Sequence, residues 1–152
     1  LASACLSFEL RFSQIRDLKK LLPTEALVYG RLPLMITENC LVQNETGCRL
    51  NRQGPCVPED GPCRCGQPNV LVDRTGAAFP LLPAYGHRTE IQNSKPLYLA
   101  DRPEHRRLGL AYARLRFTTE TAEECVSVVQ NYLDAAPAAG DFTRGLYERG
   151  VE

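Results

Sequence analysis

The residues of this chain that are most able to do chemistry are its cysteines. Seven cysteines occur among 152 residues, and five of them fall between positions 40 and 65. Cysteine thiolates, alone or with histidine, are the ligands that hold Zn²⁺ in closed tetrahedral sites. We therefore predict a structural zinc site whose ligands are Cys40, Cys48, Cys65 and His87. The alternative ligands are Cys56 and Cys63.

Two other interpretations of the cysteines stay open. Disulfides are disfavoured by the odd number of cysteines and by the absence of a visible signal peptide, which also predicts a cytoplasmic protein. Reduced thiols that serve only as small packing groups are the interpretation for Cys5 and Cys125, which lie in apolar segments. Free cysteine is commonly buried, so both side chains are predicted to pack inside the fold.

Catalytic motifs give little support for an enzyme. The chain has no G-x-S-x-G, H-E-x-x-H or glycine-rich phosphate-binding motif. Cys40 and His87 could in principle form a nucleophile and base, but such crowded cysteines are more typical of metal ligands. His105 lies in a charged stretch and is predicted to be solvated. Enzymatic activity is therefore left open.

The first elements that must position these residues form a βαβ unit. Apolar residues recur at helical spacing over residues 11–22, at Phe12, Ile15, Leu18 and Leu22, and Pro23 should end that helix. Residues 4–6 and 25–30 read as buried strands, the second closed by Gly30. A strand, a helix and a second strand in this order predict two parallel strands.

The last third of the chain repeats this pattern. Residues 108–117 are predicted as a strand, and residues 122–134 as a helix. Thr121 and Glu124 have the spacing of a capping box at the start of that helix. The tail over residues 142–152 is expected to be an ordered extension without periodicity.

Between these two parts lies a segment of different composition. Residues 38–68 are rich in cysteine, glycine and proline, and residues 69–82 read as a β-hairpin with its turn at 73–76. Residues 88–93 should add a third antiparallel strand. The predicted fold class is α/β (mixed α+β), in one domain or fragment. Its parts are a βαβ segment (1–37), a cysteine-rich antiparallel β insert (38–100), and a strand, helix and tail (101–152).

Charge and hydropathy exclude some functions. The 18 basic and 18 acidic side chains cancel, which argues against a non-specific polyanion binder. No apolar run is long enough to span a membrane, so no membrane partner is expected. Five arginines lie close together in the sequence and could form a surface that faces RNA, but the zero net charge favours a solvent-exposed surface without an RNA-binding role. They are Arg102, Arg106, Arg107, Arg114 and Arg116.

Four separated motifs resemble one known family. They are VYGRLPLMITENC (28–40), VDRTGAAFPL (72–81), NSKPLYLADR (93–102) and FTRGLYERGVE (142–152), with SFELRFSQI (7–15) as further support. Together they resemble the C-terminal part of the peptidase U32 family, the collagenase-like proteins. The resemblance implies that the βα units are the last portion of a (β/α)8-type barrel, or a degenerate copy of one, with the cysteine-rich insert attached.

The resemblance also has implications for a cofactor. Some members of that family hydroxylate RNA bases or the ubiquinone ring and carry an iron–sulfur cluster on four cysteines, whereas others are labelled proteases. In this chain Cys40 and Cys56 match two of the four ligand positions, and Pro33 and Tyr98 occupy the other two. The family-type iron–sulfur cluster is therefore not expected here.

The function implied is that of a non-catalytic, accessory C-terminal domain of a bacterial-type U32 protein. Because the chain begins in mid-pattern at Leu1, we expect the remainder of a longer protein as its partner, with a peptide or RNA as that protein's substrate. One alternative is a peptidase or other hydrolase acting on collagen-like peptides, with Glu38 or Glu90 beside a catalytic zinc. Another is the RNA-binding part of a U32-type RNA hydroxylation enzyme. Exposed parallel strand edges could also pair two copies into a homodimer.

Overall fold

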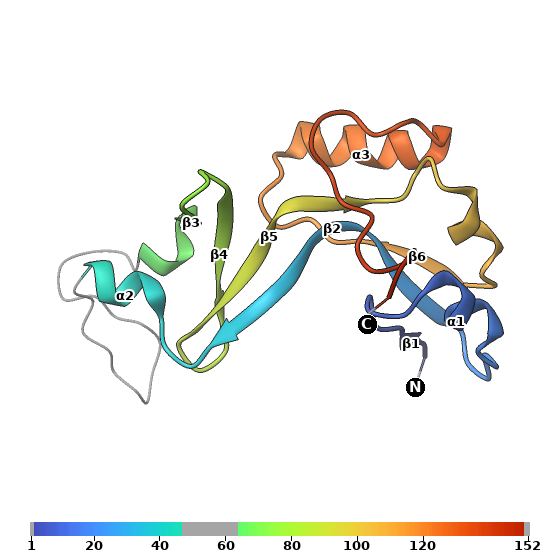
Figure 1. The fold of residues 1–152 in the computed structure, drawn as a ribbon, viewed down its shortest axis with the longest axis horizontal. Coiled ribbons are helices and arrows are strands. Elements are labelled where there is room, and N and C mark those ends of the chain that lie inside the picture. The colour runs from blue at the N-terminus through green and yellow to red at the C-terminus, as the bar shows by residue number, and fades with distance from the viewer. Residues whose placement is uncertain (1, 47–63, 151–152) are drawn as a thin grey trace. The chain divides into compact units, whose positions relative to one another are not determined.

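The computed structural model describes residues 2–46 and 64–150. These residues form a mixed α+β fold, in which six strands make one sheet with both parallel and antiparallel pairs (Figure 1). The strand order is β1-β2-β5-β4-β3, and β6 pairs with β2. The predicted mixed α+β class is confirmed.

The chain divides into two compact units. The βα unit comprises Leu1–Arg31 and Lys95–Glu152, and the hairpin unit comprises Leu32–Ser94. Two long strands, β2 (Thr24–Thr37) and β5 (Arg88–Tyr98), each contribute residues to both units. The described residues of the cysteine-rich segment belong to the hairpin unit.

Parallel strands organise the βα unit. β1 (Ala4–Cys5) pairs with the start of β2, and β6 (Tyr112–Leu115) also runs parallel to β2. Helix α1 (Phe12–Asp17) connects β1 to β2. The predicted βαβ arrangement is therefore confirmed, although β6 is shorter than the strand predicted over 108–117.

Helix α1 is also shorter than predicted. It ends at Asp17, and Leu18 already has extended backbone angles. The Lys20 ammonium donates to the carbonyl oxygens of Ile15 (2.5 Å) and Leu18 (3.3 Å), so the side chain satisfies acceptors that another helical turn would have used. Of the predicted apolar stripe, Ile15 is fully buried, but Leu18 and Leu22 are 45% and 43% exposed.

Gly30 does not close a strand as predicted, because β2 continues to Thr37. Its φ of +124° lies in the region that favours glycine, and a Cβ atom here would overlap the backbone carbonyl of Arg116. The Arg116 amide donates to the Tyr29 carbonyl oxygen at 2.9 Å in the same place. Gly30 thus permits a close approach of two backbones.

Helix α3 (Ala122–Asp134) and its capping box agree with the prediction. The Thr121 hydroxyl accepts from the Glu124 amide, and the Glu124 carboxylate accepts from the Thr121 amide. Cys125 on this helix is half-buried. Cys5 is exposed on β1, so its predicted packing role is wrong. The cause is that β1 is a strand of only two residues at the edge of the sheet, and Cys5 is its exposed residue.

Aromatic side chains fill the core of the βα unit. The ring of Tyr29 packs edge-on against Tyr98 and Tyr132, with centroids 6.5 and 6.3 Å apart. Phe12 stacks on Tyr147 of the tail at 5.2 Å. The tail, expected to be an ordered extension, therefore supplies part of the core.

Antiparallel strands organise the hairpin unit. β3 (Asn69–Val72) pairs with β4 (Ala78–Ala84), and β4 pairs with β5, as predicted. The Asp73 carboxylate closes the turn by accepting from the Thr75 and Ala77 amides. Two short helices were not predicted: α2 (Leu41–Thr46) and the 3₁₀ helix η1 (Arg64–Gly66).

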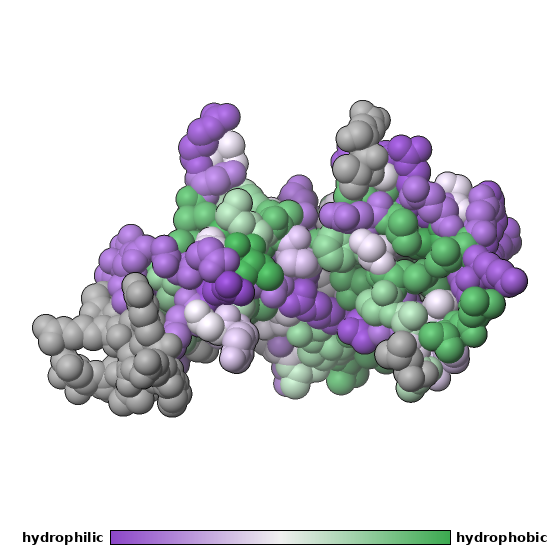
Figure 2. Space-filling view, turned by 90° about the horizontal axis from the view of Figure 1, so that it is seen from below, coloured by the Kyte–Doolittle hydropathy of each residue, from purple (hydrophilic) through white to green (hydrophobic). Residues whose placement is uncertain are grey.

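Apolar residues also reach the surface of both units. Figure 2 shows hydrophobic patches between hydrophilic ones. Exposed large apolar side chains of the βα unit include Leu21, Val126 and Leu133, and those of the hairpin unit include Met35, Val72 and Tyr85. No helix among the described residues is long and apolar enough to cross a bilayer.

Candidate functional site

Two of the predicted zinc ligands lie in the same small core of the hairpin unit. Cys40 immediately precedes α2 and is buried together with Val42 and Leu81. Cys65 lies in η1 and packs, half-buried, against this cluster. The structure therefore places the first and the last cysteine of the cysteine-rich segment at the same apolar cluster.

The remaining predicted ligands are not assembled by the described residues. His87 is half-buried in the turn between β4 and β5 and has a φ of +59°. Cys48, Cys56 and Cys63 lie outside the described residues. Over residues 2–46 and 64–150, no three His, Cys, Asp or Glu side chains gather as a metal site would require, so the predicted four-ligand set stays a prediction.

The two carboxylates considered for a catalytic zinc have other partners. The Glu38 carboxylate pairs with Arg88 at 2.9 Å on an exposed surface. The Glu90 carboxylate accepts from the Gln92 side-chain amide on the same strand. Neither residue is shown beside a group of metal ligands.

One of the four cluster-ligand positions that the resemblance implies lies inside the βα unit. Tyr98, at one of the four matching positions, is buried in the aromatic core of the βα unit. Its hydroxyl donates to the Ala136 carbonyl oxygen at 2.9 Å. Burial raises the pKa of Tyr98, which keeps the phenol neutral.

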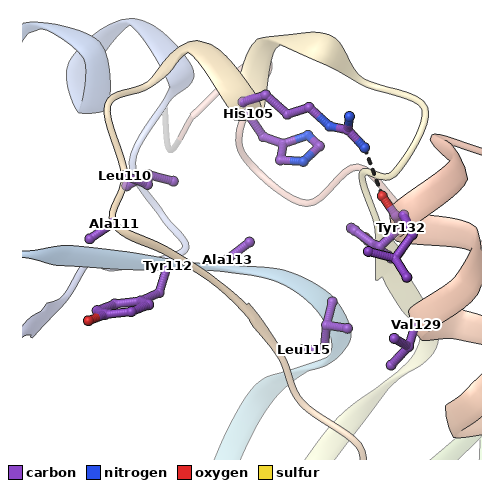
Figure 3. A pocket seen from close by; sticks show the side chains of 10 residues that line it. His105, Leu110, Ala111, Tyr112, Ala113, Leu115, Val129 and Tyr132 are labelled. Carbon is purple, nitrogen blue, oxygen red and sulfur yellow. Dashed lines mark hydrogen bonds between the residues drawn. The ribbon is translucent and has the colours of Figure 1, made fainter.

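A pocket of about 310 Å³ opens in the βα unit (Figure 3). It lies between β6, α3 and the 3₁₀ helix η2 (Pro103–Arg107). Most of its wall is aliphatic, with side chains from Leu110, Ala111, Ala113, Leu115, Val129 and Leu133. Tyr112, Tyr132, His105 and Arg106 complete the lining. This pocket was not predicted from the sequence, although Val129 lies on the helix predicted over residues 122–134.

His105 is buried beside this pocket, 6% exposed, and the prediction that it is solvated is wrong. Its Nδ1 lies 2.5 Å from the Arg102 carbonyl oxygen, which can only accept, so Nδ1 carries the proton. Burial lowers the pKa of His105, and the nearby Arg106 charge adds to this effect. The ring is consequently neutral near pH 7.

Arg106 holds a positive charge at the rim of the pocket. Its Nη2 donates to the Tyr132 carbonyl oxygen at 2.7 Å, near the C-terminal end of α3, where a cation is favourable (Figure 3). The Tyr132 hydroxyl donates to the Val28 carbonyl oxygen at 2.5 Å and accepts from the Leu99 amide at 2.8 Å. Tyr132 is held by its backbone in α3 and by the two hydrogen bonds of its hydroxyl, so its carbonyl oxygen is a fixed acceptor for Arg106.

Other partly buried charged groups in the βα unit serve as cross-links. Arg144 forms a two-pronged ion pair with Asp101, at 2.5 and 2.8 Å, and also donates to the Tyr98 carbonyl oxygen. The hydrogen bond from Arg144 lowers the pKa of Asp101. The Glu120 carboxylate accepts from the amides of Thr118 and Thr119 and from the Tyr29 hydroxyl.

The hydrogen bonds to the Glu120 carboxylate favour its ionised form. Burial alone would raise the pKa of Glu120, but the bonds donated to the carboxylate outweigh burial and leave the pKa below its ordinary value. Glu120 therefore stays ionised in the fold. It links β2, through Tyr29, to the turn that precedes α3.

The arginine cluster is partly neutralised. Arg102 pairs with Glu148 at 2.8 Å, and Arg114 pairs with Glu25 on the neighbouring strand. These ion pairs, together with the Arg106 bond to a backbone carbonyl, direct the guanidinium groups of Arg102, Arg106 and Arg114 to the protein itself.

Comparison with known proteins adds no relative: no protein-family model matches the chain, and no curated protein or solved structure matches it.

Proposed function

We propose that this chain is a non-catalytic, accessory domain of a U32-type cytoplasmic protein, and that a structural Zn²⁺ closes its cysteine-rich segment. The observation that carries the proposal is the meeting of Cys40 and Cys65 in one small core of the hairpin unit. These two thiols would supply half of a tetrahedral site. The other two ligands would come from Cys48 or its alternatives Cys56 and Cys63, and from His87.

Zinc suits this part of the chain for an energetic reason. Among the described residues of the hairpin unit, the apolar cluster around Cys40 has only two other buried members, Val42 and Leu81. A closed metal site contributes folding free energy directly and can replace a larger apolar core. The bound ion would thus hold the segment against β4 and β5.

The charged groups of the βα unit support an accessory role. Asp101 and Glu120 are carboxylates whose hydrogen bonds come from an arginine, backbone amides and a tyrosine of the same fold. Both carboxylates have lowered pKa values, the opposite of what a general acid near neutral pH needs. The chemistry would then belong to the remainder of a longer protein.

Metal analysis of anaerobically purified protein tests the zinc site. We expect about one zinc per chain for a closed four-ligand site, lost in Cys65→Ser and retained in Cys5→Ser, whose thiol is exposed in the other unit. Circular dichroism of each variant separates loss of ligand from loss of fold. Stoichiometric iron with acid-labile sulfide, or an absence of zinc in the unaltered chain, would contradict the proposal.

Activity measurements test the accessory role. We expect the chain to leave gelatin intact and to show no strongly salt-dependent binding to structured RNA. Gelatin hydrolysis that Cys40→Ser abolishes and Arg107→Gln preserves would indicate the peptidase alternative instead. RNA binding that weakens steeply with salt would indicate an RNA-binding domain.

A further inference from the structure

We propose that the pocket between η2, β6 and α3 binds a small amphipathic anion, a molecule with an aromatic or branched-alkyl body and a single carboxylate. The inference is independent of the zinc site and of the U32 assignment. It rests on the shape, lining and charge of the pocket.

The walls favour an apolar body. Leu110, Leu115 and Val129 line the cavity, and Leu133 and Tyr112 on its border are 70% and 58% exposed. Covering such side chains removes apolar surface from water, which stabilises a complex by about 25 cal/mol per Å². A volume of about 310 Å³ is at the lower end of the range for ligand pockets, so the ligand is small.

The rim favours a negative charge. Arg106 carries five N–H donors, and toward the described part of the chain it uses one of them, in the 2.7 Å bond to the Tyr132 carbonyl oxygen. Among the described residues, no carboxylate pairs with Arg106, and its side chain is exposed. A guanidinium group with spare donors in a fixed position suits a carboxylate, which it can bind through two parallel bonds.

The other polar groups of the lining add no competing charge. His105 is neutral near pH 7, and its Nδ1 proton is directed to the Arg102 carbonyl oxygen. The Tyr132 hydroxyl is directed away to the backbone of Val28 and Leu99. Among the lining residues, Arg106 is therefore the one charged group, and it lies beside a mostly aliphatic wall.

Three matched probes test this assignment: 4-phenylbutyrate, the uncharged 4-phenylbutyramide and the cationic 4-phenylbutylamine. Binding to the full chain is followed by the methyl NMR signals of Leu115 and Val129. We expect the acid to shift these signals with a dissociation constant on the order of 1 mM, as is usual for a ligand of this size. The amide should bind about fivefold more weakly, because one charge-assisted contact is lost, and the amine more weakly still.

Variants at Arg106 and Arg107 distinguish a direct contact with Arg106 from a general attraction of the anion to positive charge on this surface. In Arg106→Gln, we expect the acid and the amide to bind equally. Arg107→Gln removes a neighbouring exposed charge and should keep the preference for the acid. Val129→Asp places a negative charge in the wall and should abolish binding of the acid while the amine still binds.

Three results would overturn the proposal. One is equal binding of acid and amide by the unaltered chain, and another is the absence of any shift at the Leu115 and Val129 methyls. The third is broadening of the Leu133 methyl signals that depends on protein concentration without any probe, which would assign this face to a second copy of the chain.

Discussion

The hydroxyl of Tyr147 donates a hydrogen bond of 2.6 Å to the carbonyl oxygen of Leu27, joining the C-terminal tail to a central parallel strand. Tyr147 is almost completely buried, and its ring stacks on Phe12 of helix α1. One side chain of the tail therefore contacts both the first helix and strand β2.

Tyr147→Phe tests the hydroxyl and Tyr147→Ala tests the ring. Removing the hydroxyl takes a partner from a buried carbonyl, so we expect a loss of about 1–2 kcal/mol in the free energy of unfolding. Removing the ring leaves a cavity and should cost about 3–5 kcal/mol. Urea unfolding followed by circular dichroism measures both. If Tyr147→Phe were as stable as the unaltered chain, the hydrogen bond to the Leu27 carbonyl oxygen would make no net contribution to the free energy of unfolding.

The ion pair between Asp101 and Arg144 should stabilise the βα unit above the ordinary pKa of aspartate. The pKa of Asp101 is lowered from 3.8 in the fold, so its contribution is present above pH 3.8 and disappears as the pH falls through the folded value. Asp101→Asn should cost about 1–3 kcal/mol at neutral pH, as is usual for a charge-assisted hydrogen bond. It should also flatten the acid limb of a stability–pH curve.

The exposed pair of Glu38 and Arg88 is the matched control for that variant. Its side chains are 80% and 45% exposed, so Glu38→Gln should change the free energy of unfolding by less than about 0.5 kcal/mol. An equal cost for the two substitutions would mean that the burial of Asp101 and Arg144 has no energetic consequence.

Gly30→Ala should be among the most destabilising single substitutions of the chain. The added methyl group would overlap the Arg116 carbonyl, and φ at this position is +124°. We expect a loss of about 3 kcal/mol, from backbone strain together with displacement of the strand. Gly76→Ala is the control, since its φ is +84° but the space around it is open, and strain alone should cost about 1 kcal/mol. Thermal unfolding of both variants should therefore give a clearly larger decrease in Tm for position 30.

His105 should make the βα unit less stable in mild acid. Burial lowers its pKa below 6.5, so the unfolded chain binds a proton that the folded chain does not. Stability is then complete above pH 6.5 and falls as the pH drops from there through the folded value. His105→Asn should reduce the decrease in Tm between about pH 7 and about pH 5. His87→Asn is the control, since it retains His105 and should show the same decrease in Tm as the unaltered chain. If only His87→Asn lost the decrease, the pH dependence would belong to His87 and not to His105.

Local sequence patterns predicted much of the secondary structure. The capping box at Thr121 and Glu124, the turn at Asp73 and the pairing of β1 with β2 depend on residues that are close in sequence or on the order strand, helix, strand. Helix α1 was predicted too long because the Lys20 ammonium binds the Ile15 carbonyl oxygen, which a longer helix would use for a backbone hydrogen bond. The spacing of apolar residues carries no information about such a side-chain bond.

The candidate sites were harder to predict than the elements. The cysteine pattern singled out Cys40 and Cys65, but their shared core depends on β4 and β5 packing beside α2 and η1. The pocket combines η2, β6 and α3, and none of these segments contains a recognisable binding motif. His105 looked solvated because its neighbours in sequence are charged, whereas its neighbours in space are Tyr132 and the Arg102 carbonyl.

By itself, the sequence determined the mixed α+β class, the antiparallel strands and the position of helix α3, because these follow from short-range periodicity and capping. The tertiary structure alone decided that Gly30 faces the backbone of Arg116, that Tyr147 fills the core and that Arg106 stands at the rim of an apolar pocket. Each of these depends on residues far apart in the chain. Their meeting is set by the free energy of packing the whole fold, to which local propensity contributes only a part.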